Sequence, residues 1–242
     1  MLTSVRSLMA ATLLAGSVFV AAPAAAQDSG IEISGVAALV SEYRFRGVDL
    51  SGGDIAVQAG VTASASGFYV GTWASSLDED SVGYGHTELD VYAGYAGEIA
   101  PGVTFDVSGL YYLYPNAPAG DFDYYEFIGK TSFEVGPGGL TLGVAYSPEQ
   151  DSLGGDDNLY LWADASVGLP GTPVSITAHL GYTDGFLTYT ADGNAFDYSI
   201  GASLALNDTL GIGVAYTGVD GQGTVAYPFA DDAVVVSLTA GF

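Results

Sequence analysis

The sequence predicts an all-β protein: a transmembrane, antiparallel up-and-down β-barrel of about twelve strands, with short periplasmic turns and long acidic extracellular loops. Three observations support this fold class. Apolar and polar residues alternate along nearly the whole chain after residue 26, charges in the alternating segments fall on one face, and short and long connections alternate. Helical periodicity is nearly absent, because glycine interrupts every helical candidate.

The N-terminal segment has the layout of a secretory signal peptide. Arg6 is its one charged residue, residues 8–22 form an apolar run, and residues 24–26 are alanines that offer a cleavage site before Gln27. The run is shorter than the roughly 20 residues that a membrane-spanning helix needs. We therefore expect export, removal of residues 1–26, and an outer-membrane β-barrel over residues 27–242.

The composition excludes several classes of function. Only 4 Lys and Arg residues oppose 28 acids, for a formal net charge of −24. Nucleic acid is therefore excluded as a partner, because binding phosphates depends on Lys and Arg. The chain has 0 cysteines, so it can carry neither a disulfide nor a cysteine-linked lipid. We also expect no cofactor.

One face of the predicted strands is apolar and uncharged. Its clearest positions are Ile33, Ala37, Leu39, Tyr43 and Phe45 in the first strand and Val234, Val236, Leu238, Ala240 and Phe242 in the last. A soluble sandwich would instead expose a polar face rich in lysine and glutamate. A membrane barrel presents the uncharged face to lipid, where a cation would cost roughly 2–4 kcal/mol at the midplane.

The opposite face carries every charge that we place in a strand. Because this face would line the enclosed lumen, its charged residues are our candidates for the lumen wall or a constriction. They are Glu42, Arg44, Arg46, Glu88, Asp90, Asp106, Glu126, Lys130, Asp164 and Asp197.

The connections and aromatic residues agree with a membrane barrel. Short turns are expected around residues 66–67, 100–102, 136–139, 170–173 and 207–208, and long loops at 47–54, 77–86, 115–123, 148–157, 184–194 and 218–231. Aromatic residues of the apolar face cluster near the strand ends, as interfacial girdles require. They are Tyr43, Phe45, Tyr111, Tyr125, Tyr146, Tyr182, Phe196 and Tyr216 beside long loops, and Tyr95, Phe105, Phe133 and Phe242 beside short turns.

Four segments, in order along the chain, resemble the signatures of the TorF porin family. They are residues 41–47 (SEYRFRG, continuing to Ser51), 67–75 (GFYVGTWAS), 88–95 (ELDVYAGY) and 111–115 (YYLYP) with 124–126 (YYE). Asp49 departs from the family pattern, which has a serine there. The resemblance implies a porin-like outer-membrane barrel and names no substrate. Phe242, ending an alternating strand, resembles the signal that the barrel-assembly machinery reads in such proteins.

These observations predict a non-enzymatic channel for passive diffusion of small solutes, in contact with outer-membrane lipid. The excess of acids predicts a preference for cations, since rings of charge set selectivity. Arg44 and Arg46 could face acids such as Glu88 and Glu126 across a constriction, or could equally form a static network of ion pairs that holds the barrel's shape.

Two other classes of function stay open. A structural or adhesive barrel would have its lumen plugged by side chains such as Trp162, Tyr92 and Tyr112. An outer-membrane hydrolase is less favoured, because the histidines are His86, in a loop, and His179, on a lumenal face, and the hydrolase motifs are missing. Ser175 and Thr177 share the face of His179, but the spacing of ~7 Å between alternate residues of one strand leaves no hydrogen bond to it.

The acidic loops raise the question of a divalent-cation site. Their acids include Asp78, Glu79, Asp80, Asp156 and Asp157. No segment has the calcium-loop pattern with its closing glutamate, so solvated loops are favoured over a dedicated metal site.

Overall fold

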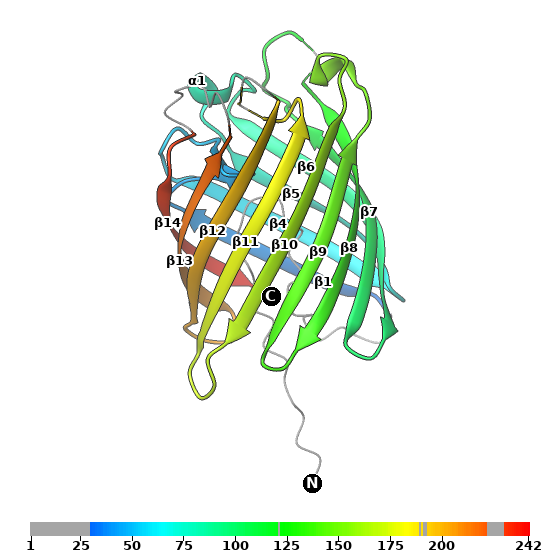
Figure 1. Ribbon diagram of the computed structural model, residues 1–242, viewed down its shortest axis with the longest axis vertical. Coiled ribbons are helices and arrows are strands. Elements are labelled where there is room, and N and C mark those ends of the chain that lie inside the picture. The colour runs from blue at the N-terminus through cyan, green and yellow to red at the C-terminus, as the bar shows by residue number, and fades with distance from the viewer. Residues whose placement is uncertain (1–29, 121, 189, 191–192, 222–229) are drawn as a thin grey trace.

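The structure, a computed structural model, describes residues 30–120, 122–188, 190, 193–221 and 230–242. The predicted signal segment, residues 1–26, lies outside the described residues. Twelve long strands form one closed antiparallel barrel, in which each strand pairs with its neighbour along the chain and β14 pairs with β1 (Figure 1). The predicted fold class and strand number are confirmed.

The barrel strands alternate in direction around the ring. They are β1 (Glu32–Val40), β4 (Ala56–Ala65), β5 (Phe68–Ser76), β6 (Thr87–Ala100), β7 (Val103–Leu113), β8 (Tyr124–Val135), β9 (Gly138–Ser147), β10 (Asn158–Gly168), β11 (Val174–Gly185), β12 (Asn194–Ala205), β13 (Leu210–Asp220) and β14 (Ala233–Gly241). Short elements lie in the long connections: β2 (Arg44–Phe45), β3 (Val48–Asp49), α1 (Glu79–Val82) and the 3₁₀ turn η1 (Asp151–Leu153). Among the described helices, none is long and apolar enough to cross a membrane.

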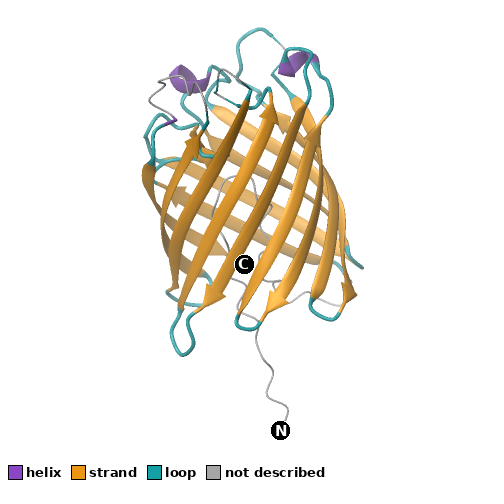
Figure 2. Cartoon of the chain, viewed as in Figure 1, coloured by secondary structure: helices purple, strands orange, loops and turns teal. Residues whose placement is uncertain are grey.

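Tight turns gather at one end of the barrel, and the helical turns and longer loops gather at the other (Figure 2). The turn between β4 and β5 shows the local cause. Ser66 and Gly67 have φ of 53° and 87°, and they join the directly paired residues Ala65 and Phe68. Two successive positive φ values give the turn whose twist matches paired strands.

The outer face of the barrel is apolar. Large hydrophobic side chains such as Leu142, Leu161 and Leu180 are exposed there, with 47%, 44% and 54% of their surface accessible. Their sequence neighbours turn to the inner face: Thr141 and Gly143, Tyr160 and Trp162, His179 and Gly181. This arrangement follows from the period of two along a strand and supplies the apolar band that lipid requires.

Leu142, near the middle of β9, offers a test of which face meets lipid. Leu142→Arg is expected to lower the unfolding free energy in phospholipid vesicles by about 2–4 kcal/mol, because it places a cation in hydrocarbon. Thr141→Arg is the matched control: Thr141 faces the lumen and pairs directly with Asp164, so its effect is expected to be small. Equal losses in the two variants would contradict this assignment.

Large lumenal rings lie across glycines of neighbouring strands. A β-carbon added at Gly71 would overlap the Tyr92 ring, and one added at Gly143 would overlap the Trp162 ring. Tyr92 and Trp162 are the directly paired partners of these glycines. Glycine therefore lets each ring lie against the wall, because no side chain stands beneath it.

The predicted first strand is wrong at its C-terminal end. β1 ends at Val40, and residues 41–55, which we name loop 1, contain the small hairpin β2–β3. Arg46 and Gly47, with φ of 48° and 81°, form its two-residue turn. Alternation continues through Phe45 because a hairpin strand alternates just as a barrel strand does.

Three charged candidates and two aromatic residues are corrected by this boundary. Glu42, Arg44 and Arg46 belong to loop 1 rather than to a barrel strand. Tyr43 is only 4% exposed and Phe45 packs against buried residues, so neither belongs to a lipid-facing girdle. Other predicted girdle residues are exposed on the outer face, among them Tyr95, Phe105, Tyr111, Tyr125, Tyr146, Phe196, Tyr216 and Phe242.

Candidate functional site

Loop 1 crosses the lumen from one wall to the opposite wall. In the ring order, β9 lies opposite β1, where loop 1 begins. The side chain of Arg46 reaches Glu126 on β8 and Tyr160 on β10, the two strands that flank β9. Because Glu126 alternates with the exposed residues Tyr125 and Phe127, its carboxylate points inward. The tip of loop 1 therefore lies inside the barrel.

Arg46 anchors loop 1 to the far wall. Its Nη2 donates to both oxygens of Glu126, at 2.7 and 2.9 Å, and its guanidinium lies 4.2 Å from the centre of the Tyr160 ring. Burial works against the charge, but the nearby carboxylate of Glu126 more than offsets it, so the pKa of Arg46 is raised above its usual value. Arg46 is therefore permanently charged.

Glu126 is held by donors from three different elements. Besides Arg46, the hydroxyl groups of Tyr112 on β7 and Ser147 on β9 donate to it, at 2.9 and 3.0 Å. Its side chain is only 1% exposed. The carboxylate thus ties loop 1 to three neighbouring strands.

Tyr160 connects this anchor to a second cluster on β10, β11 and β12. The Tyr160 hydroxyl lies 2.9 Å from Nε2 of His179 and donates to Asp197 at 3.2 Å. Nε2 of His179 lies 2.8 Å from the Asp197 carboxylate, and Nδ1 lies 2.6 Å from that of Asp164. An imidazolium can donate from both ring nitrogens, so this geometry suits a charged histidine between two acids.

His179 is a site residue that the sequence reasoning missed. Its inward direction was predicted, but it was considered beside Ser175 and Thr177 of its own strand. Its partner Asp164 stands directly opposite on β10. The short turn at residues 170–173 sets that register, so pairing the two strands across it would have revealed the contact.

The remaining described cations also have acidic partners. Lys130 on β8 contacts Asp106, its directly paired residue on β7, at 3.3 Å, and Tyr69 donates to Asp106 at 2.7 Å. Within loop 1, Arg44 forms an ion pair with Glu42 and also donates to the backbone carbonyl of Asp231 at 2.7 Å. Loop 1 is thereby fixed to the segment before β14.

Glu88 and Asp90 on β6 differ from these pairs. They are 1% and 8% exposed, and the Tyr43 hydroxyl donates to one oxygen of Glu88 at 3.2 Å. Burial, and then the nearby charges of Glu88 and Asp90, raise the pKa of Tyr43 well above its usual value, so the hydroxyl keeps its proton. No Lys or Arg among the described residues pairs with either acid.

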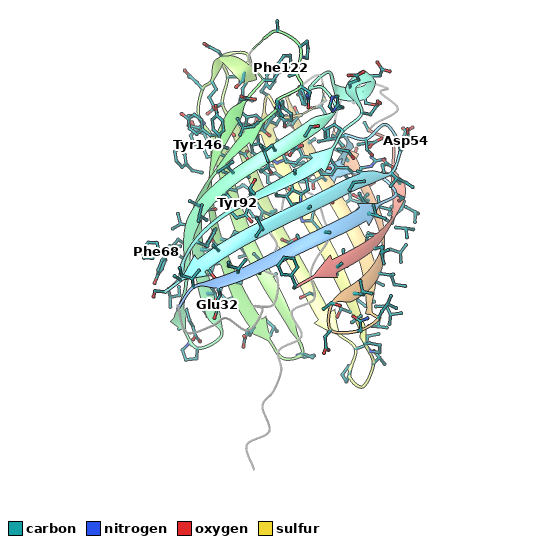
Figure 3. The ribbon with its side chains drawn as sticks, turned by 180° about the vertical axis from the view of Figure 1, so that it is seen from behind. Glu32, Asp54, Phe68, Tyr92, Phe122 and Tyr146 are labelled. Carbon is teal, nitrogen blue, oxygen red and sulfur yellow. The ribbon has the colours of Figure 1, made fainter. Side chains whose placement is uncertain are left out.

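The region above these acids is packed with aromatic rings. Tyr112 stacks on Tyr124 with ring centres 4.3 Å apart, and Tyr84 packs against Tyr114 and Phe122. Figure 3 places Phe122 among the long loops, whereas Tyr92 lies on the barrel wall. Aromatic packing therefore extends from the lumen to the long-loop end of the barrel.

Comparisons with known proteins agree with this architecture. Residues 24–242 match the family described as "Bacterial protein of unknown function (Gcw_chp)". The chain belongs to the Gcw_chp family. A search of curated proteins found no match to this Gcw_chp chain.

Two solved porins are similar in structure to this Gcw_chp protein. The NanC porin is 12% identical, with a TM-score of 0.58, over 86% of this chain and 97% of its own. The KdgM porin, in a structure with disordered oligogalacturonate, is 10% identical, with a TM-score of 0.58, over 86% of this chain and 99% of its own. At such low identity, the likeness shows the porin-like barrel fold alone.

The acidic loops of the Gcw_chp chain are organised by hydrogen bonds of their own. Asp157 accepts from the Tyr146 hydroxyl at 2.9 Å, and Asp78 accepts from the Ser81 hydroxyl at 2.5 Å. Within the described ranges, no group of three or more His, Asp or Glu side chains is arranged to hold a metal ion.

Proposed function

We propose that this Gcw_chp protein is an outer-membrane channel for passive diffusion of small solutes, with loop 1 as its constriction. The distribution of charge is the main support: an apolar outer wall encloses the ion pairs of Arg46, Lys130 and His179. A barrel of this kind belongs in the outer membrane. The similar chain length and fold of NanC and KdgM, and the resemblance to the TorF porins, favour a channel.

Export and assembly complete this proposal. Residues 1–26 would be removed as a signal peptide, and the barrel-assembly machinery would read Phe242. The backbone of Phe242 pairs with Gly35 of β1 through two hydrogen bonds of 3.0 Å, at the seam between the first and last strands. Single-channel recording of the purified full chain in planar bilayers tests the channel: discrete conductance steps are expected, and their absence would contradict it.

The channel is expected to prefer cations. Arg44, Arg46 and Lys130 are each neutralised by an acid, whereas Glu88 and Asp90 are not. Rings of acidic charge favour cations in a pore. Under a potassium chloride gradient, the reversal potential is expected to lie toward the potassium equilibrium potential. A value toward the chloride potential would show the opposite selectivity. The acidic wall also disfavours an anionic sugar chain of the kind held by KdgM.

A plugged structural or adhesive barrel is the second candidate. It is favoured by one observation: the tip of loop 1 is buried, with Arg46 6% and Val48 4% exposed. The two candidates differ in a simple readout. A plugged barrel would show no steps as the wild type but would conduct once residues 43–50 were replaced by a short glycine–serine linker, whereas a channel conducts in both forms.

A hydrolytic site finds little support around His179. Both ring nitrogens are directed at carboxylates, so neither is free to take a proton from a hydroxyl. Ser199, which pairs directly with His179, has a buried hydroxyl without a hydrogen-bond partner among the described residues. Lipid or peptide hydrolysis that is lost in a His86→Ala, His179→Ala double variant would support an enzyme instead.

A further inference from the structure

We propose that Glu88 and Asp90 form a binding site for a singly charged cation inside the lumen, beside loop 1. The cation would be an alkali-metal ion or the ammonium group of an organic solute, which share the same charge and the same acceptors. This inference rests on the proposed channel function and assigns that channel a specific site on β6.

The first support is an unmet demand for positive charge. Glu88 and Asp90 stand two positions apart on the inner face of β6, and both are at least nine-tenths buried. Oε2 of Glu88 and Oδ1 of Asp90 have no hydrogen-bond partner among the described residues. Buried ionised carboxylates are costly unless they are paired, so a cation at these two oxygens would stabilise the arrangement.

The second support is that the arginine of loop 1 that reaches the far wall forms its ion pair with another acid, Glu126. Arg46 is the charged group of loop 1 that reaches the far wall, and both oxygens of Glu126 occupy its Nη2. Glu88 is contacted instead by the hydroxyl of Tyr43, which donates to Oε1, while Oε2 has no hydrogen-bond partner among the described residues. The protein therefore supplies the two acids with a hydrogen bond but with no countercharge.

The surroundings fit a monovalent cation better than a divalent one. Calcium takes six to eight oxygen ligands, commonly several of them carboxylates. Here only two carboxylates are present, and their neighbours are hydroxyl groups and aromatic rings. Ser75 pairs directly with Glu88, Trp73 pairs directly with Asp90, and the Tyr43 ring lies 5.6 Å from the Trp73 ring. Aromatic rings beside carboxylates also suit an ammonium group, because the ring face attracts cations.

Trp73 provides a readout that does not depend on conduction. The chain has 2 tryptophans, so Trp162→Phe leaves Trp73 as the sole reporter beside the site. In this background, the full-length protein in detergent is titrated with potassium chloride or with methylammonium chloride, each replacing tetrabutylammonium chloride at constant ionic strength. A saturable change in Trp73 fluorescence is expected with at least one cation. Saturation with methylammonium alone would identify an organic ammonium, and saturation with both a general cation site.

The matched variants are Glu88→Gln/Asp90→Asn and Glu79→Gln/Asp80→Asn. Each removes two negative charges, but Glu79 and Asp80 are exposed in α1, away from the lumen. The β6 variant is expected to lose saturation and to move the reversal potential toward zero, whereas the α1 variant is expected to keep both properties.

The outcomes separate this site from the proposed channel. The site would be overturned, and the channel would stand, if neither cation gave a saturable signal and the β6 variant kept the discrete, cation-selective steps of the wild type. Protonated carboxylates would give that result. A saturable signal that depends on Glu88 and Asp90, in a wild type that never conducts, would support the site while the channel proposal fails.

Discussion

Arg46→Ala is expected to release loop 1 from the far wall, to raise single-channel conductance and to destabilise the barrel. The substitution leaves the Glu126 carboxylate buried without its cation and removes the contact with the Tyr160 ring. Breaking a buried ion pair by removing one partner costs about 3–5 kcal/mol. The expected measurements are larger conductance steps in planar bilayers and a lower unfolding free energy in vesicles.

Arg46→Lys is the matched control for this variant. It keeps the charge that pairs with Glu126 but lacks the planar guanidinium that lies 4.2 Å from the centre of the Tyr160 ring, so an intermediate effect is expected. Glu126→Gln with Arg46→Met removes both charges together and is expected to recover part of the lost stability. Unchanged conductance and stability in Arg46→Ala would show that loop 1 is held in place by its other contacts.

His179→Ala is expected to produce the second large effect, a loss of stability of about 3–5 kcal/mol in vesicles. The two carboxylates of Asp164 and Asp197 would then face each other across the lumen wall with no cation between them. Tyr160 would also lose its contact with the imidazole, through which β11 is joined to the loop 1 anchor.

Two further variants separate the loss of the cation at His179 from the mere loss of an imidazole ring. Adding Asp164→Asn to His179→Ala removes one of the two carboxylate charges left without a cation, and it is expected to restore part of the stability. His86→Ala changes an exposed loop histidine and is expected to be neutral. If His179→Ala behaves as His86→Ala does, the histidine between two acids contributes nothing to the barrel's stability.

Much of the barrel could be predicted from the alternation of apolar and polar residues alone, which repeats every two residues along a strand. Along β9 and β10, for example, each residue has only two directions available, and the uncharged set must face lipid. The inward direction of Asp106, Lys130, Asp164 and Asp197 followed from this. The pairing register of two strands can also be predicted wherever the turn between them is short, as between β10 and β11.

Loop 1 could not be predicted in the same way, because its contacts are not set by strand pairing. Arg46 and Glu126 lie 80 residues apart in sequence, and nothing in the alternation brings them together. One local signal was available: a glycine follows Arg46 between two short alternating pairs, which is typical of a two-residue hairpin turn. It would have placed a hairpin turn directly after Phe45, but it would not have revealed the end of β1 at Val40 or the inward fold of loop 1.

The seam between β1 and β14 imposes an order of events on biogenesis. Val36 pairs with Gly241, so the ring stays open until the last strand has been made. Until then, β1 and β13 present unpaired edges, which are templates for association with other chains. A nearly complete sheet must therefore be kept apart from other chains until β14 is in place, and a chain that loses β14 keeps both unpaired edges.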